Sequence, residues 1–126
     1  MIGKIMLEGK RILVVDDEPD LREITAFEFE HKGAKVFTAD GGYEAMELLK
    51  KESYDLVVSD VRMPEGTGEE LLDSMAESKI LTKTPIILVT GFADITRDEA
   101  LERGALELFF KPVKWANLLE FIDSKL

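Results

Sequence analysis

The sequence predicts a doubly wound α/β fold with five parallel strands and five helices. Short apolar runs rich in β-branched residues alternate along the chain with segments of helical periodicity, which is the pattern of repeated βα units. The first, third and fourth runs are almost entirely apolar, as expected of central parallel strands that helices cover on both faces. The chain has 126 residues, 45% of them hydrophobic, which suits one domain with a buried core and leaves no room for a second.

The strands are predicted where these runs lie, at residues 11–15, 35–39, 56–59, 85–89 and 108–110. The second run differs from the others, because polar and apolar residues alternate in Lys35-Val36-Phe37-Thr38. Alternation of this kind is typical of a strand with one covered face, so we expect the second strand at an edge of the sheet.

Proline and glycine at expected helix ends, together with apolar stripes at helical spacing, predict the positions of the helices. The first helix is expected to begin near Pro19, since proline suits an opening turn, and to end at Gly33, which can adopt the left-handed cap conformation. The later stripes are Ala45, Leu48 and Leu49 in the second helix, Leu71, Leu72 and Met75 in the third, and Trp115, Leu118, Leu119, Ile122 and Leu126 in the last. We interpret the last stripe as a surface that docks on the sheet, with a partner-binding groove as the alternative.

The first helix is less regular than the others. Phe27 and Phe29 cannot both share the face defined by Leu21 and Ile24, because residues two apart do not face the same way on a helix. One of the two phenylalanines is therefore expected to be exposed. An exposed phenylalanine is usually unremarkable, and its alternative role is a contact for a partner helix.

Composition limits the kinds of metal site. The chain has no cysteine, so it can form neither disulfides nor thiolate metal sites, and the lone His31 cannot form a histidine cluster. Any metal must then be a hard cation held by oxygen, with Mg²⁺ the leading candidate.

Charge and targeting signals limit the partners. The 26 acidic and 16 basic side chains give a net charge of −10, which disfavours direct binding to nucleic acid and to anionic membrane surfaces. No apolar stretch is long enough for membrane insertion, and the opening residues lack a secretory signal. We therefore expect a soluble, cytoplasmic protein.

Polar residues with chemical potential follow four of the predicted strands. Asp16 and Asp17 come after the first, Asp60 after the third, Thr90 after the fourth and Lys111 after the fifth. In a parallel sheet these strand ends share one edge, so the side chains are expected to converge on one crevice. Three carboxylates brought together would repel one another, and such a cluster ordinarily holds a divalent cation. The arrangement predicts a site for phosphoryl transfer to an aspartate, with Asp60 the best placed nucleophile.

Each of these residues also has an ordinary structural interpretation. Asp16 and Asp17 can form a turn and a helix cap, and Asp60 can cap the turn after its strand. Thr90 can be a β-branched residue that ends a strand, and Lys111 a solvated surface lysine. In the functional interpretation, the Thr90 hydroxyl and the Lys111 ammonium bind phosphoryl oxygens.

Two residues beside these positions also have predicted roles. Gly91 would let a backbone N–H approach a ligand closely, because it has no Cβ. Pro112 would fix the turn that aims Lys111, and the peptide bond before it can be cis.

The joint pattern resembles the receiver domain of bacterial two-component response regulators, in particular the stand-alone chemotaxis type. The matching segments are Ile12 to Pro19, Asp60 to Pro64, Ile86 to Gly91, and Gly104-Ala105 through Lys111-Pro112. The resemblance implies a flavodoxin-like sheet with strand order 2-1-3-4-5. It also implies a receiver domain at residues 10–126, preceded by a lead-in at residues 1–9 that either packs on the sheet through Ile2, Ile5, Met6 and Leu7 or is disordered.

The resemblance assigns a role to each residue of the acidic cluster. Asp60 corresponds to the phosphoacceptor, which receives a phosphoryl group from a sensor histidine kinase or a histidine phosphotransfer protein. Asp17 corresponds to a direct Mg²⁺ ligand, Asp16 to a ligand acting through water, and the backbone carbonyl of Arg62 completes the metal's protein ligands.

The resemblance also implies a switch. Thr90 and Lys111 match the pair that binds the phosphoryl oxygens, and an inward movement of Thr90 would bias the face formed by the fourth helix, fifth strand and fifth helix. The output is a changed affinity for a downstream effector protein or output domain, by a monomer or a phosphorylation-promoted dimer. Such a protein is not an enzyme beyond its own phosphorylation and autodephosphorylation.

The chain departs from the family pattern at the switch. Leu108 stands where the family usually has tyrosine or phenylalanine. Phe110 lies on the same strand face and is a possible substitute, although Phe109 and Phe110 are more simply interpreted as core residues.

Two further departures lie beside the acceptor. The stretch Glu65-Gly66-Thr67-Gly68 replaces the usual Gly-x-Asp-Gly, with Gly68 keeping the turn glycine. Arg62 and Phe92 occupy the variable places that flank the phosphoryl group, and Phe92 is hypothesised to shield the acyl phosphate from water.

Other classes share parts of this pattern. A flavodoxin-like electron carrier needs a Ser-, Thr- and Gly-rich phosphate loop after the first strand, where this chain has acidic residues. A metal-dependent aspartyl phosphatase usually spaces its two aspartates two residues apart, whereas Asp16 and Asp17 are adjacent. A receiver-like interaction module without phosphorylation chemistry is the remaining alternative, and the sequence does not separate a stand-alone receiver from part of a longer regulator.

Overall fold

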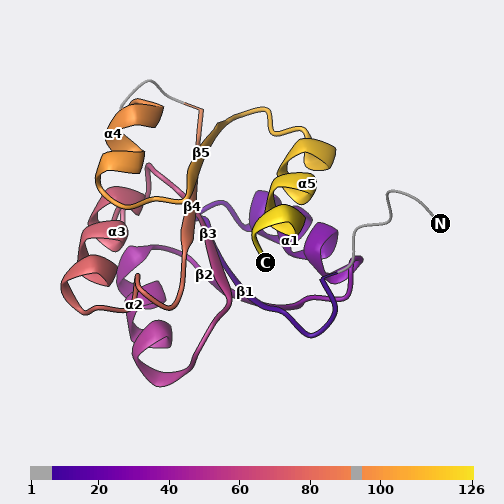
Figure 1. The fold of residues 1–126 in the computed structure, drawn as a ribbon, viewed down its shortest axis with the longest axis horizontal. Helices are drawn as coiled ribbons and strands as arrows, with labels where there is room; N and C mark the ends of the chain where they lie inside the picture. The colour runs from indigo at the N-terminus through magenta and orange to yellow at the C-terminus, as the bar shows by residue number, and fades with distance from the viewer. Residues whose placement is uncertain (1–6, 92–94) are drawn as a thin grey trace.

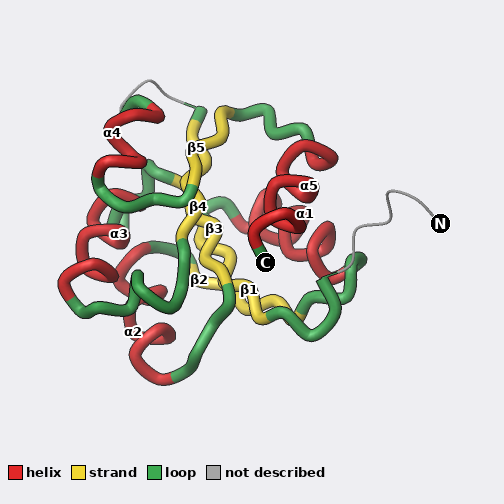
Figure 2. The backbone as a smooth tube through the Cα atoms, viewed as in Figure 1, coloured by secondary structure: helices red, strands yellow, loops and turns green. Residues whose placement is uncertain are grey.

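The computed structural model describes residues 7–91 and 95–126, which form a five-stranded parallel sheet with helices on both faces (Figure 1, Figure 2). The strand order is β2-β1-β3-β4-β5, so the predicted fold class and topology are confirmed. The strands are β1 (Arg11–Val15), β2 (Lys35–Ala39), β3 (Leu56–Asp60), β4 (Ile86–Thr90) and β5 (Glu107–Phe110). The helices are α1 (Pro19–Glu30), α2 (Gly42–Lys51), α3 (Gly68–Glu77), α4 (Arg97–Glu102) and α5 (Trp115–Lys125).

The sheet separates two layers of helices. Figure 1 shows α1 and α5 on one face and α2, α3 and α4 on the other. Successive strand residues alternate between the two cores: Leu13 and Val57 pack on the side of α2 and α3, and Val14 and Val58 on the side of α5. The central strands are therefore apolar on both faces, as their sequences predict.

The strand boundaries differ from the prediction at the residues of the candidate site. Asp60 and Thr90 are the last residues of β3 and β4 and do not follow them, because Asp60 is in register with Val89, and Thr90 with Phe110. The two functional candidates are thus held by strand pairing.

The interpretation of Phe110 as a core residue is wrong. Phe110 is 54% exposed, because it is the last residue of an edge strand and has a neighbouring strand on one side only. Phe109 is half-buried, and its ring packs edge-to-face on Phe121 of α5 with a centroid distance of 5.7 Å.

Helix α1 begins at Pro19 as predicted but ends at Glu30, before Gly33, and it carries one exposed phenylalanine. Gly33 adopts φ +96°, a left-handed conformation that favours glycine. Phe29 is fully buried and Phe27 is 62% exposed, so the prediction that one ring is exposed is confirmed. The face of Leu21 and Ile24 is not the buried one, because α1 buries Phe29 while Leu21 and Ile24 are exposed.

Residues near both ends of the described chain pack on the same face of the sheet. Leu118, Leu119 and Ile122 of α5 are buried on the sheet as predicted, whereas Leu126 at the end of the stripe is 37% exposed. Leu7 is buried in the α5-side core, and its N–H donates to the Lys32 carbonyl at 2.8 Å. The predicted positions Ile2, Ile5 and Met6 lie outside the described residues.

Two arginines tie α4 to its neighbours. Arg97 donates to Glu107 of β5 at 2.6 Å, and this hydrogen bond and positive charge lower the pKa of Glu107. Arg103 pairs with Asp73 and Glu69 of α3 at 2.6 and 2.7 Å. In the part of the chain that the structure describes, no helix is long and apolar enough to cross a membrane.

Candidate functional site

The three predicted carboxylates converge at the carboxyl edge of the sheet. Asp16 follows β1 and Asp60 ends β3, and these adjacent strands pair Val15 with Ser59, which brings the two aspartates to the same level. One carboxylate oxygen from each of Asp16, Asp17 and Asp60 lies within 4.8 Å of the others. Three hard oxygen donors at this spacing can hold a divalent cation.

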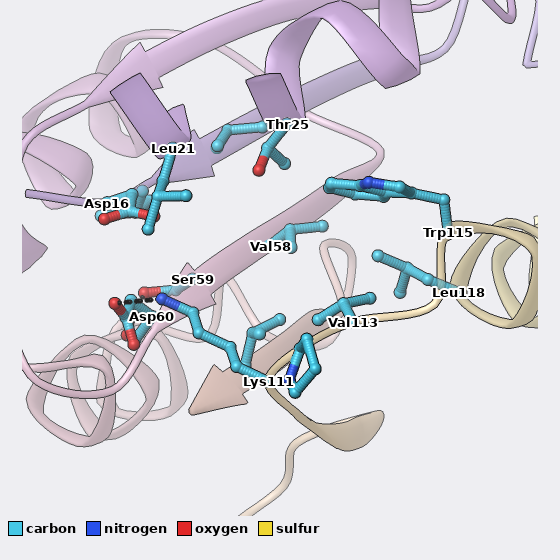
Figure 3. Close-up of a pocket in the computed structure, with 14 residues that line it drawn as sticks. Asp16, Leu21, Thr25, Val58, Ser59, Asp60, Lys111, Val113, Trp115 and Leu118 are labelled. Atoms are coloured by element: carbon cyan, nitrogen blue, oxygen red, sulfur yellow. Dashed lines mark hydrogen bonds and ion pairs between the residues drawn. The ribbon is translucent and has the colours of Figure 1, made fainter. Parts of the chain in front are cut away.

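Asp60 is fixed on both carboxylate oxygens. Its Oδ2 accepts from the Lys111 Nζ at 3.0 Å, as the dashed line in Figure 3 marks, and its Oδ1 accepts from the Val61 N–H at 2.8 Å. The backbone of Lys111 is held beside β4, because its N–H donates to the Thr90 carbonyl at 2.9 Å. The peptide bond between Lys111 and Pro112 is cis. The structure therefore brings the predicted nucleophile and the predicted cation together.

Asp16 is the most buried member of the cluster, with 7% of its surface exposed. Its Oδ1 accepts from the Glu18 N–H at 3.0 Å, and its backbone carbonyl accepts from the Arg22 guanidinium at 2.8 Å. Burial raises the pKa of Asp16, and the negative charges of Asp60 and Asp17 raise it further, against the opposing effects of the Glu18 hydrogen bond and the Lys111 charge. An ionised Asp16 is thus held at a cost in free energy.

At Lys111, the surrounding charges outweigh burial and the pKa shifts in favour of the charged form. Burial alone would lower its pKa, but the hydrogen bond to Asp60 and the negative charges of Asp60, Asp16 and Glu18 outweigh burial and raise it. Lys111 is therefore a cation in this site at neutral pH.

The loop after β3 is shaped by glycines and a helix cap. A Cβ on Gly68 would collide with the backbone oxygen of Asp60, and Gly66 adopts φ +99°. Thr67 caps α3 in a capping box with Glu70, in which each side chain accepts from the other residue's N–H. These contacts hold the acceptor strand and the start of α3 at a fixed separation.

The switch candidates lie on the other side of Asp60. Thr90 is fully buried. Leu108 on the adjacent strand is 5% exposed and lies in the same core as Ala100 of α4. Gly91 has room for a side chain, since an added Cβ would lie 3.8 Å from the Lys111 Cβ, so the space around it does not require glycine. Arg62 is exposed, and Phe92 lies outside the described residues.

Sequence reasoning missed three residues that support the site. Glu18 contributes charge at Lys111, Arg22 braces the Asp16 backbone, and the Ser59 hydroxyl donates to the Asp60 carbonyl at 2.8 Å. Of these, only Glu18 carried a signal, since it continues the acidic run after β1. The Thr67–Glu70 capping box was readable as Thr-x-x-Glu.

Comparison with known proteins decides the family. Residues 12–123 match the family described as the response regulator receiver domain. The chain belongs to this receiver family. It is 32% identical to the response regulator protein PilR of Pseudomonas aeruginosa over 95% of this chain and 27% of PilR. It is 39% identical to an uncharacterized 14.6 kDa protein of Leptolyngbya boryana over 90% of this chain and 87% of that protein.

The fold comparison agrees. The response regulator TrrA of Thermotoga maritima, solved in complex with Mg²⁺-BeF, has a TM-score of 0.82 and 34% identity, with 93% of this receiver and 99% of TrrA covered. The receiver spans about a quarter of the length of PilR but most of the Leptolyngbya protein. Receiver domains generally act as signal transducers and bind Mg²⁺ at an acidic pocket, and the carboxylate cluster of this receiver is consistent with such a pocket.

Proposed function

We propose that this receiver accepts a phosphoryl group on Asp60 from a phosphohistidine of a sensor histidine kinase or a histidine phosphotransfer protein. The observation that supports this best is the 3.0 Å ion pair between Asp60 and Lys111 inside a cluster of three carboxylates. An Asp60 oxygen attacks the phosphorus, and the phosphorus–nitrogen bond breaks with its electron pair going to the leaving imidazole. The product is an acyl phosphate on Asp60.

The donor set fits Mg²⁺. The cluster offers carboxylate oxygens with no nitrogen or sulfur donor, as a small hard cation requires. In this proposal Asp17 and Asp60 would hold the ion directly, Asp16 would hold it through water, and the backbone carbonyl of Arg62 would complete the set. When bound, Mg²⁺ offsets negative charge on the transferring group.

Two donors from neighbouring strands receive the phosphoryl oxygens. Lys111 already contacts an acceptor oxygen at 3.0 Å, so its ammonium is close to where a phosphoryl group on Asp60 would lie. Thr90 ends β4, one residue beyond the partner of Asp60 in the strand register, and its hydroxyl provides the second contact. Both donors stabilise the charge that phosphorylation adds.

Phosphorylation is proposed to change the face formed by α4, β5 and α5. An inward movement of Thr90 would alter the packing of Leu108, which lies in the same core as Ala100 of α4. This route uses aliphatic packing where the family resemblance implies an aromatic ring. Phe110, in register with Thr90 and exposed, is the alternative ring for the switch.

The output is proposed to be a changed affinity for a downstream effector protein or output domain, as a monomer or a phosphorylation-promoted dimer. The relatives named as response regulators support such partners. The net charge of −10 argues against direct binding to nucleic acid. We place the receiver at residues 10–126, after a lead-in at residues 1–9, in the cytoplasm, with no activity beyond its own phosphorylation and dephosphorylation.

Trapping the acyl phosphate tests the assignment of the acceptor. The protein is incubated with acetyl phosphate and Mg²⁺, reduced with borohydride, and digested for peptide mass spectrometry. Reduction of an aspartyl phosphate yields homoserine, which is expected at position 60 and at none of the other aspartates. Homoserine at Asp16 or Asp17 would reassign the acceptor, and its absence from folded protein would favour an interaction module without this chemistry.

A further inference from the structure

A cavity of about 440 Å³ lies between α1 and α5 below the carboxylate cluster. Figure 3 shows Leu21 and Thr25 of α1 on one wall, Trp115 and Leu118 of α5 on the opposite wall, and Val58 of the sheet between them. This volume lies in the range of small-molecule sites, and its lining is mainly apolar.

The cavity follows from the sequence of α1. This helix places the short side chain of Thr25 between two larger ones, Leu21 and Phe29. At the far end, the rings of Phe29 and Trp115 meet edge-to-face with a centroid distance of 6.4 Å and join the two helices. The space between the helices is therefore bounded by Trp115, which Phe29 supports, at one end and by polar groups at the other.

The polar end carries excess negative charge. Asp16, Ser59, Asp60 and Lys111 line it, and Figure 3 shows them together at the end away from Trp115. Lys111 is paired with Asp60, and the Ser59 hydroxyl donates to the backbone carbonyl of Asp60. The carboxylate of Asp16 therefore adds a negative charge that the Asp60–Lys111 ion pair does not balance. A cationic group entering here gains attraction in a partly desolvated site, whereas an anionic group is repelled.

We propose that this cavity binds a small amphipathic amine. Its ring system packs between Thr25 and Trp115, and its ammonium group lies toward Asp16 and Asp60. The binding site goes beyond the phosphoacceptor function, because it lies on the apolar side of the cluster and requires no phosphorylation.

Binding has a regulatory consequence that does rest on the proposed function. Asp60, Lys111 and Leu21 line both this cavity and the open acidic pocket above it, which also contains Asp17 and Arg62. An ammonium group beside Asp60 would compete with Mg²⁺ and with the approach of a phosphoryl donor. An occupied cavity is therefore expected to slow phosphorylation.

Titration with matched probes tests the binding site. Tryptamine, its neutral analogue tryptophol, and methylamine are added to the protein in EDTA and followed by ¹H–¹⁵N NMR. Tryptamine is expected to cause saturable shifts in α1 and α5, with tryptophol at least about tenfold weaker because it lacks the charge. Methylamine, which lacks the ring, is expected not to saturate. Equal affinity of tryptamine and tryptophol, or saturable shifts that spare the residues lining the cavity, would overturn the proposal.

Three variants locate the site. Thr25→Phe fills the cavity and is expected to abolish saturable tryptamine binding, whereas Thr25→Ser retains it. Asp16→Asn is expected to weaken tryptamine and leave tryptophol unchanged. Should Thr25→Phe not fold, Val113→Phe fills the cavity from the other wall. Tryptamine binding that survives a folded cavity-filling variant contradicts the proposal.

The regulatory consequence is measured separately as the rate of phosphorylation by acetyl phosphate with and without tryptamine. A protein that binds tryptamine but is not phosphorylated in its absence would contradict the proposed function and leave the cavity site supported. A phosphorylation rate that saturating tryptamine leaves unchanged contradicts the regulatory consequence alone.

Discussion

Replacing Asp16 by asparagine is predicted to stabilise the metal-free protein, although it removes a buried residue of the candidate site. Asparagine has the same shape, and its side-chain carbonyl can still accept the Glu18 N–H that Asp16 Oδ1 accepts at 3.0 Å. The substitution removes only the charge. Because the Asp16 charge is buried beside Asp17 and Asp60, its loss relieves repulsion and a desolvation cost.

The size of the effect follows from the geometry. Two unit charges 4.8 Å apart repel by roughly 1–3 kcal/mol for effective dielectric constants between about 80 and 20. Asp16 has two such neighbours, and its attraction to Lys111 cancels about one of them. The expected net stabilisation is about 1–2 kcal/mol, which corresponds to a rise in Tm of about 3–7 °C for a domain of this size.

Urea unfolding in EDTA and in Mg²⁺ measures both halves of this prediction. At a Mg²⁺ concentration about ten times its Kd, the wild type gains about 1.4 kcal/mol by mass action. Asp16→Asn is expected to gain less, so the advantage of the variant shrinks when Mg²⁺ is added. Asp55→Asn is the matched control, because Asp55 also accepts a backbone N–H, from Arg11 at 2.8 Å, but lies outside the cluster. An Asp16→Asn protein no more stable than wild type in EDTA would refute the reasoning.

Three further predictions test the packing and the pH dependence. Gly68→Ala is expected to lose about 2 kcal/mol of stability, since the added Cβ collides with the backbone oxygen of Asp60, whereas Gly91→Ala is expected to be tolerated. The midpoints of urea unfolding compare the two variants, and equal losses of stability would contradict the account. Phe29→Ala should cost about 3–5 kcal/mol and Phe27→Ala less than about 0.5, measured by thermal unfolding, because only the first ring is buried. Because the pKa of Glu107 is lowered in the folded protein, its ionised form stabilises the fold above the ordinary glutamate pKa, and this stability is lost as the pH falls through the lowered value. The free energy of unfolding of Glu107→Gln is therefore expected to be lower than that of wild type at pH 7 and to converge with it in acid. A difference in stability that does not depend on pH would count against the ion pair.

The strands and the site were predictable for a common physical reason. The runs that form β1, β3 and β4 are apolar because helices cover both faces, and parallel strands end at one edge, so Asp16, Asp60 and Thr90 had to meet there. The ion pair of Asp60 with Lys111 follows from the same geometry. The pattern placed the ends of β3 and β4 too early, since Asp60 and Thr90 still pair with residues of the neighbouring strands.

The helix faces were less predictable. Apolar character alone suggested that Leu21 and Ile24 define the buried face of α1, yet they are 37% and 50% exposed. The sheet offers α1 a surface that Phe29 fills and that Thr25 leaves open, and this depends on the position of α5, which local periodicity cannot specify. Phe110 was misassigned for a similar reason, because burial at the end of an edge strand depends on tertiary neighbours.

The central claim is that Asp60 accepts a phosphoryl group in a reaction that needs Mg²⁺, and intact mass spectrometry tests it most directly. Wild type, Asp60→Asn and Asp55→Asn are incubated with acetyl phosphate, each with Mg²⁺ and with EDTA. The account predicts one phosphoryl adduct in wild type and Asp55→Asn, formed only with Mg²⁺, and none in Asp60→Asn. An adduct that persists in Asp60→Asn or in EDTA would contradict it, as would the absence of any adduct on folded wild type supplied with Mg²⁺.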